Sequence, residues 1–197
     1  MNITKKLAIA FAATALAAGA QAATLFSHDF GSVDQQTDTS IAGSFSTSAG
    51  AADVSFTLDG FNTLDGDNFY IDVFTLKVNG TDVFSGTWDL GGGGSSYIIS
   101  GPSGATATLN GNQTVSVFVP ISLIAGLNTV QFTYDSPDSF DGTSRAGFQG
   151  LGDEGWGLGQ VAVTTSAVPE PGSIALMLAG LGVIGGLARR RGAKTLG

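Results

Sequence analysis

Cysteine is absent from this sequence of 197 residues, which excludes disulfide bonds, thiolate metal sites and cysteine nucleophiles. Histidine occurs once, as His28, so a serine–histidine–aspartate triad would depend on that residue alone. No serine stands in the Gly-x-Ser-x-Gly pattern that exposes a nucleophilic hydroxyl. We therefore predict no catalytic residues and a non-enzymatic protein. A pair of carboxylates acting as the acid and base of a glycosidase stays the open alternative.

Basic residues are scarce between Ala23 and Val168. This stretch contains only Lys77 and Arg145 against fifteen acidic residues, which gives it a net charge of −13. Such a charge repels nucleic acids and anionic lipids, so we expect no nucleic-acid partner. It would attract divalent cations, but a solvated acidic surface that keeps an exported protein soluble explains it equally well.

The N-terminal segment Met1–Ala22 has the pattern of a secretory signal peptide. Lys5 and Lys6 precede an apolar run over residues 7–18, and Ala20-Gln21-Ala22 supplies the small residues of a cleavage site. We predict export by the Sec machinery with cleavage after Ala22. An uncleaved anchor helix is the alternative.

The C-terminal segment, residues 168–197, joins three features. Pro169-Glu170-Pro171 precedes an uncharged apolar run, Ser173–Ala188, which is followed by Arg189-Arg190-Arg191. As a helix the run would be about 24 Å long, somewhat short of the ~30 Å hydrocarbon core of a bilayer. Because it is apolar on every side, we predict a short transmembrane helix. A buried helix of a soluble domain is the alternative.

This C-terminal arrangement resembles the PEP-CTERM sorting signal of bacterial envelope proteins. The resemblance rests on the Pro-Glu-Pro triplet, the short apolar helix and the arginine-rich end. It implies recognition by an exosortase with cleavage near Pro169-Glu170-Pro171, and a Gram-negative source that makes extracellular polysaccharide. The expected course is export across the inner membrane, transient membrane anchoring, and release to the cell surface or the extracellular matrix.

The stretch between the two signals, residues 23–167, consists of short segments separated by Gly, Asn and Asp turns. Apolar and polar residues alternate in these segments, which is the period of half-buried strands. The predicted strands are Leu25–Phe30, Ile41–Thr47, Asp53–Leu58, Ile71–Val78, Thr81–Phe84, Ala105–Leu109, Gln113–Val119, Asn128–Tyr134 and Trp156–Thr164.

Two Asn-Gly pairs, Asn79-Gly80 and Asn110-Gly111, join neighbouring strands and predict two-residue hairpin turns. Ile121–Leu127 is interpreted as a single helical turn. The number and spacing of the strands predict an all-β exported domain, an antiparallel β-sandwich of the jelly-roll type.

Acidic residues cluster in Leu64–Asp72, where Asp65 and Asp67 flank a glycine. Carboxylate and amide oxygens are the ligands that Ca²⁺ prefers. A second acidic turn, at Asp153 and Glu154, could share the ion. We therefore predict a structural calcium site formed by these four residues, with a solvated acidic surface as the alternative.

The same segments resemble secreted bacterial sandwich domains related to lectins and carbohydrate-binding modules. The resemblance rests on the Asp-Gly-Asp turn, on Val73–Gly80 and on a late Asp-Glu-x-Trp-Gly motif. In those domains the late motif often continues as Ile-Asp-Asn-Val, where this chain has Leu158-Gly159-Gln160-Val161.

A carbohydrate-binding face needs exposed aromatic rings. The candidates are Tyr70, Trp88, Tyr97 and Trp156. Burial in the core of the sandwich is the alternative for each of them. The sequence thus supports an exported, exopolysaccharide-associated surface protein, with a sugar-binding module that holds calcium as the second hypothesis.

Overall fold

The computed structural model describes residues 22–111, 113–150, 153–165 and 177–184. Ala23–Ser166 forms one compact unit, the β domain, and the helical residues 177–184 belong to a second unit. The predicted boundaries after residues 22 and 167 remain predictions.

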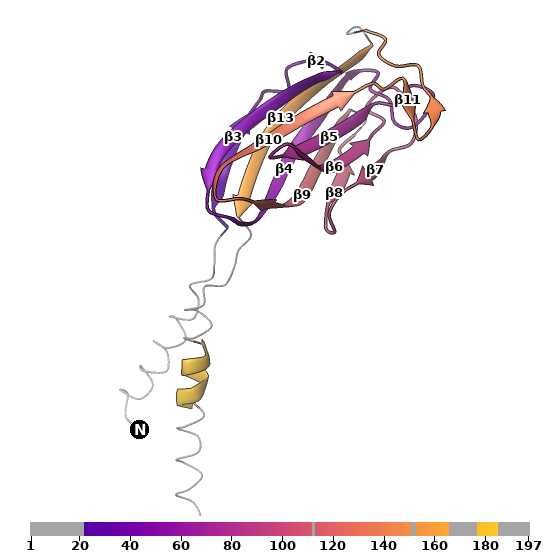
Figure 1. Ribbon diagram of the computed structural model, residues 1–197. Coiled ribbons are helices and arrows are strands. Elements are labelled where there is room, and N and C mark those ends of the chain that lie inside the picture. Colours follow the sequence, from indigo (N-terminus) through magenta and orange to yellow (C-terminus); the bar gives the residue numbers. More distant parts are fainter. Residues whose placement is uncertain (1–21, 112, 151–152, 166–176, 185–197) are drawn as a thin grey trace, which may run out of the picture. The chain divides into compact units, whose positions relative to one another are not determined.

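The β domain contains two large sheets in which every strand pair is antiparallel. The first sheet has the order β1 (Thr24–Asp29), β13 (Glu154–Thr165), β4 (Gly50–Asn62), β9 (Thr114–Leu123), β8 (Thr106–Leu109), with β2 (Gln35–Gln36) also paired to β13. The second has the order β3 (Thr39–Thr47), β10 (Gly126–Asp135), β5 (Val73–Val78), β6 (Thr81–Thr87), β7 (Tyr97–Ser100). A small hairpin of β11 (Ser139–Phe140) and β12 (Thr143–Ser144) follows β10. Figure 1 shows the two sheets lying against each other.

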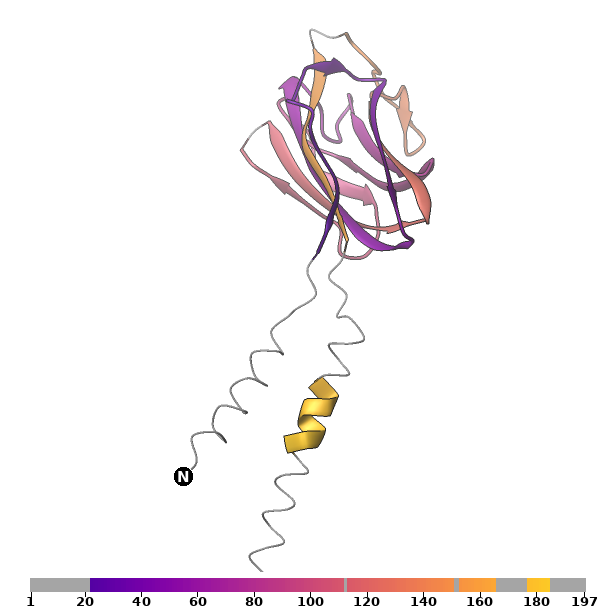
Figure 2. The ribbon, with the colours of Figure 1, turned by 90° about the vertical axis from the view of Figure 1, so that its left-hand side faces the viewer.

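Aromatic side chains join the two sheets. The ring of Phe56 on β4 lies 5.3 Å from Phe74 on β5 and 5.2 Å from Phe132 on β10. Tyr134 on β10 lies 5.9 Å from Trp156 on β13. These contacts belong to one continuous buried cluster to which both sheets contribute side chains. The all-β antiparallel sandwich predicted from the alternating pattern is therefore confirmed, and Figure 2 shows it from the side.

The hairpin at Asn79-Gly80 has the predicted geometry. Both residues have positive φ, +52° and +79°, and Val78 pairs with Thr81 across a two-residue turn. The second hairpin differs, because Leu109 pairs with Val115 and the amide of Asn110 donates to Thr114. The loop between β8 and β9 is thus longer than the predicted two residues.

Substituting Gly80 with alanine is expected to destabilise the domain by about 1 kcal/mol, because a Cβ strains a left-handed backbone. Urea unfolding measures the change. Gly50→Ala is the matched control: Gly50 has no positive φ, and an added Cβ there meets no atom within 4 Å. Equal losses in the two variants would contradict the turn assignment.

Three features of the β domain correct the sequence prediction. Ile121–Leu127 forms no helical turn, because β9 runs on to Leu123 and β10 already begins at Gly126. Strand β7 was missed, since its four residues are too few for an alternating pattern. Strand β4 is longer than predicted at both ends.

A helix covers residues 177–184, within the apolar run Ser173–Ala188. Among the described residues, no helix reaches the length and apolarity that crossing a bilayer requires. The remainder of the run lies outside the described residues.

Candidate functional site

The acidic loop Leu64–Asp72 connects β4 to β5 and carries the polar side chains that the sequence singled out. Backbone bridges hold it against the segment that follows β6, pairing Leu64 with Leu90 and Asp67 with Ser95. The amide of Asp67 donates to the Ser95 carbonyl at 2.8 Å, and the Ser95 amide donates back at 3.1 Å. The loop is therefore fixed by main-chain contacts rather than by its side chains alone.

Asp67 binds two side chains from distant parts of the chain. Arg145 donates to Oδ1 at 3.0 Å, and the hydroxyl of Tyr97 donates to Oδ2 at 2.7 Å. The hydrogen bond to Asp67 raises the pKa of Tyr97 to about 12. Arg145 also donates to the carbonyl of Asn68 at 2.8 Å, and its guanidinium lies 5.8 Å from the ring centre of Phe140. We call Asp67, Tyr97, Phe140 and Arg145 the Arg145 cluster.

Asp65, two residues before Asp67 in the same loop, is largely buried. Its Oδ1 accepts a hydrogen bond from the Asn68 amide at 2.8 Å. Burial raises the pKa of Asp65, and the charges of Asp153 and Asp89 act in the same direction. A Cβ on Gly92 would come within 2.5 Å of Asp65 Oδ1, so glycine at this position lets the loop after β6 close over the carboxylate.

A buried polar chain continues inward from the loop. Asp72 is 0% exposed and accepts hydrogen bonds from the amide of Asp65, at 2.7 Å, and from the hydroxyl of Ser136. Ser136 lies 2.7 Å from the hydroxyl of Thr37. Burial raises the pKa of Asp72 to about 7, an effect to which nearby Glu154 contributes. We call Thr37, Asp72, Ser136 and Glu154 the buried acid cluster.

Glu154, at the start of β13, is almost fully buried. Its Oε2 accepts a hydrogen bond from the amide of Gln149 at 2.9 Å, and its pKa is raised by burial. The buried acid cluster thus contains two buried carboxylates, Asp72 and Glu154. Among the described residues, Arg145 forms an ion pair only with Asp67.

Two of the predicted calcium ligands are already engaged by protein groups. Asp67 is engaged by Tyr97 and Arg145, whereas Asp153 accepts hydrogen bonds from Thr63. Within the described part of the chain, no group of three or more carboxylate or histidine side chains is placed to hold a metal ion. The calcium site at Asp65, Asp67, Asp153 and Glu154 therefore stays a prediction, which the hydrogen bonds already accepted by Asp67 and Asp153 do not favour.

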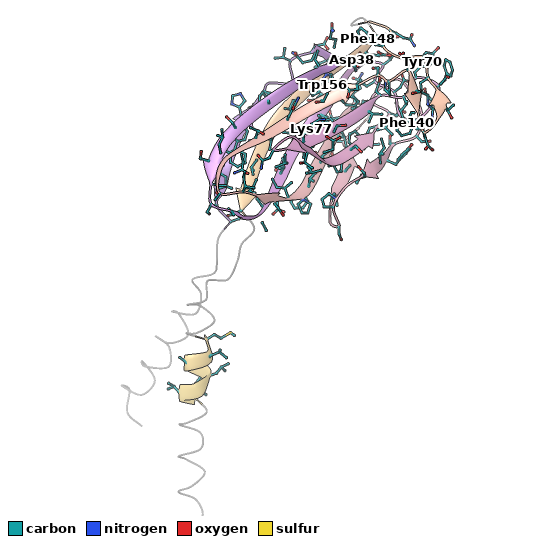
Figure 3. The ribbon with its side chains drawn as sticks, viewed as in Figure 1. Asp38, Tyr70, Lys77, Phe140, Phe148 and Trp156 are labelled. Atoms are coloured by element: carbon teal, nitrogen blue, oxygen red, sulfur yellow. The ribbon has the colours of Figure 1, made fainter. Side chains whose placement is uncertain are left out.

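The four aromatic candidates fall into two groups. Trp88 and Trp156 are 2% and 0% exposed and lie in the core. Their prediction as part of a sugar-binding face is therefore wrong, because a buried indole cannot stack on a ligand. Tyr70 and Tyr97 are 41% and 38% exposed. Phe69, which the sequence analysis missed, is 60% exposed, and its ring lies 5.3 Å from that of Tyr70. Figure 3 shows Tyr70 and Phe140 at the same end of the domain.

The outer face of the first sheet holds an open groove of about 430 Å³. It is lined mainly by hydroxyl and amide side chains, among them Thr57, Ser116 and Gln160, beside Phe118, which is 38% exposed. This groove is a second surface where a polar ligand could lie.

The residues of the predicted sorting signal, Pro169, Glu170, Pro171, Arg189, Arg190 and Arg191, lie outside the described residues. Residues 167–191 match the family described as the PEP-CTERM protein-sorting motif. The sorting signal predicted from the sequence is thus confirmed. No curated protein matches this chain.

Several solved structures are similar to this chain. One is a family 35 carbohydrate binding module from an environmental isolate, with 17% identity over 66% of this chain and 69% of that chain and a TM-score of 0.33. Another is a family 35 carbohydrate binding module from Clostridium thermocellum, with 12% identity over 71% and 92% and a TM-score of 0.33. A third is a ruminal GH26 endo-beta-1,4-mannanase, with 16% identity over 68% of this chain but 19% of the enzyme and a TM-score of 0.33. At such TM-scores the similarity supports no conclusion about ligand or activity.

Proposed function

We propose that this chain is a non-enzymatic protein of a Gram-negative cell envelope, exported by the Sec machinery and processed by an exosortase. Residues 177–184 and their apolar neighbours anchor it transiently in the inner membrane. Cleavage near Pro169-Glu170-Pro171 then releases the β domain to the cell surface or the extracellular matrix, where it associates with exopolysaccharide.

The observation that carries this proposal is the sorting motif over residues 167–191. The rest of the chain suits the role. The motif directly follows the compact unit Ala23–Ser166, so cleavage there would free a folded β domain. The net charge of −13 between Ala23 and Val168 keeps such a domain soluble and away from anionic lipid after release.

Mass spectrometry of the mature protein in each cell fraction tests the proposal. We expect the wild-type chain to end near Pro169-Glu170-Pro171 and to lack Arg189–Arg191. Glu170→Ala is expected to keep the intact tail and stay in the membrane fraction. Asp82→Ala is the matched control, because it removes an acid whose surface pair with Lys77 contributes little. An intact tail in every wild-type fraction would refute exosortase processing.

A second candidate function is carbohydrate binding at the end of the domain that carries the Arg145 cluster. The observation that favours it is the set of exposed rings next to fixed polar groups: Tyr97 and Arg145 are held by Asp67, and Phe69 and Tyr70 precede Asp72 in the same loop. Sugars bind to aromatic faces flanked by hydrogen-bonding groups that are already oriented. This candidate does not depend on the predicted calcium site.

Removing both exposed tyrosines tests this candidate. If the site binds sugar, Tyr70→Ala with Tyr97→Ala is expected to weaken binding at least ~10-fold, equivalent to about 1.4 kcal/mol. Glycan arrays and pull-downs with the producer's own polysaccharide measure it. Phe118→Ala is the control, because Phe118 is as exposed as Tyr97 but lies in the groove on the first sheet. If only Phe118→Ala loses glycan binding, the sugar site lies in that groove instead. If the wild type binds no glycan on the arrays, carbohydrate binding is refuted.

A further inference from the structure

The two sheets of the sandwich end in four edge strands: β1 and β8 in the first sheet, β3 and β7 in the second. An edge strand exposes backbone N–H and C=O groups that can pair with another strand. Proteins therefore protect their edges by keeping them short, by placing charges on them or by interrupting them with a bulge. The four edges of this domain differ in such protection.

Three of the edges are protected. Strands β7 and β8 have only four residues each, and the pairing of β7 is interrupted by a shift in register. Strand β1 has a shift in register near its start and ends in His28 and Asp29. Each of these strands offers at most a short or irregular template to a partner.

Strand β3, Thr39–Thr47, has none of these features. It is nine residues long, contains no proline and no charged residue, and pairs with β10 in one continuous register without a bulge. Apart from this pairing, no backbone hydrogen bond between described residues involves residues 40–47. Every second residue of an edge strand points its N–H and C=O away from its own sheet. Figure 1 shows β3 at the left-hand margin of the domain, and Figure 2 turns that side toward the viewer.

From this contrast, we propose that β3 pairs in antiparallel fashion with the β3 strand of a second copy of this chain. The pairing joins the two second sheets into one continuous sheet across a two-fold axis. Such an interface is self-complementary, since each residue of one strand meets a residue of the same strand in its partner.

The distribution of charge on the β domain favours a second copy of this chain as the partner of β3. With a net charge of −13, two β domains repel each other over most of their surfaces. Strand β3 carries no charge, and its neighbour β10 carries only Asp135, at its end. Two copies can therefore meet at this edge without like charges facing each other, whereas a basic peptide finds no acid there to bind.

The side chains of β3 also suit self-pairing. Ser40, Ala42, Ser44 and Ser46 alternate along the exposed face and are all small. Hydroxyl and methyl groups of this size fit opposite one another across an antiparallel pair without a clash. The interface does not depend on sorting or on glycan binding, so it can be tested separately from both.

The absence of cysteine makes a single introduced thiol a specific probe of this interface. Residues directly opposite in an antiparallel pair have Cα atoms about 4.5–5.5 Å apart, which is within the range of a disulfide. We would introduce Ser40→Cys, Ala42→Cys, Ser44→Cys and Ser46→Cys singly into the full chain, in mild detergent, and oxidise with diamide. An equimolar mixture of the Ala42→Cys and Ser44→Cys chains covers the register in which Gly43 faces its own copy, since Ala42 then lies opposite Ser44.

We expect at least one of these five samples to form a disulfide-linked dimer at least tenfold faster than the controls Thr129→Cys and Gln131→Cys. The control positions lie one strand inward, paired with Ser44 and Ala42. Equal rates in the β3 and β10 variants, or no dimer in any β3 sample, would overturn the proposal.

Sedimentation of the cysteine-free chain gives an independent measurement. Ala42→Lys with Ser44→Lys places lysines opposite one another across the two-fold axis, so the dimer is expected to dissociate. Thr129→Lys with Gln131→Lys adds the same charge on β10 and is expected to leave the dimer intact. A wild-type chain that stays monomeric at all concentrations, or a dimer that both double variants retain, refutes pairing through β3. Recovery of β3 bound to an unrelated peptide would refute self-pairing as well.

Discussion

Raising the pH from about 5 to about 8 is expected to destabilise the β domain, because Asp72 then loses its proton inside the protein. Asp72 is fully buried, and burial raises its pKa to about 7. In the unfolded chain an aspartate titrates near 3.9. Between these two values the folded state binds a proton that the unfolded state has lost, so the free energy of unfolding falls as the pH rises.

The expected size of this effect is large. A difference of about three pKa units corresponds to about 4 kcal/mol in total, which is fully present only below the unfolded pKa. About 2.5–3 kcal/mol of it is lost between pH 5 and 8, as the pH rises through the folded pKa. Burial also raises the pKa values of Asp65 and Glu154, so both carboxylates act in the same direction. For a domain of this size, we expect the melting temperature to fall by roughly 10 °C.

Thermal melts in buffer with a chelator, which removes cations that would stabilise the ionised acids, measure this dependence. Asp72→Asn cannot ionise, so we expect a much flatter pH profile and a variant more stable than wild type at about pH 8. Asp82→Asn, on an exposed strand end, is expected to keep the wild-type profile. A wild-type domain that is more stable at the higher pH would show that Asp72 stays ionised in the fold.

The sandwich could be predicted because its strands follow local rules. Val115, Val117 and Val119 alternate with polar residues, and all three are buried as that pattern requires. Asn79-Gly80 encodes its turn in two residues, since both adopt positive φ. Strand β7 contains no such signal, because Tyr97–Ser100 is too short to alternate.

The site was predicted less well because its geometry depends on long-range contacts. Arg145 binds Asp67 across 78 residues of sequence, and Ser136 binds Asp72 across 64. No local pattern reveals either partner, so the acidic loop looked like a set of free calcium ligands. The scarcity of basic residues was the one available signal, since Arg145 is one of only two between Ala23 and Val168.

Phe74→Ala is expected to be the most destabilising of the substitutions considered, at about 3–5 kcal/mol, through lost burial and the cavity that remains. Phe74 is fully buried, and its ring lies within 5.3–6.4 Å of four others: Phe56, Phe84, Trp88 and Tyr134. It thus connects β5 both to its own sheet and to the opposite one. Urea unfolding measures the loss, and Phe74→Leu, which refills most of the space, is expected to recover more than half of it.

Phe69→Ala is the matched control, because it deletes the same ring from a position that is 60% exposed; we expect a loss below about 1 kcal/mol. Similar losses in Phe69→Ala and Phe74→Ala would contradict the placement of the core.

The comparison matters for an exported chain without cysteine, since no disulfide can limit its unfolded state. Domains of this kind are stable by only about 5–15 kcal/mol. The aromatic contacts around Phe74 would therefore decide whether the domain stays folded.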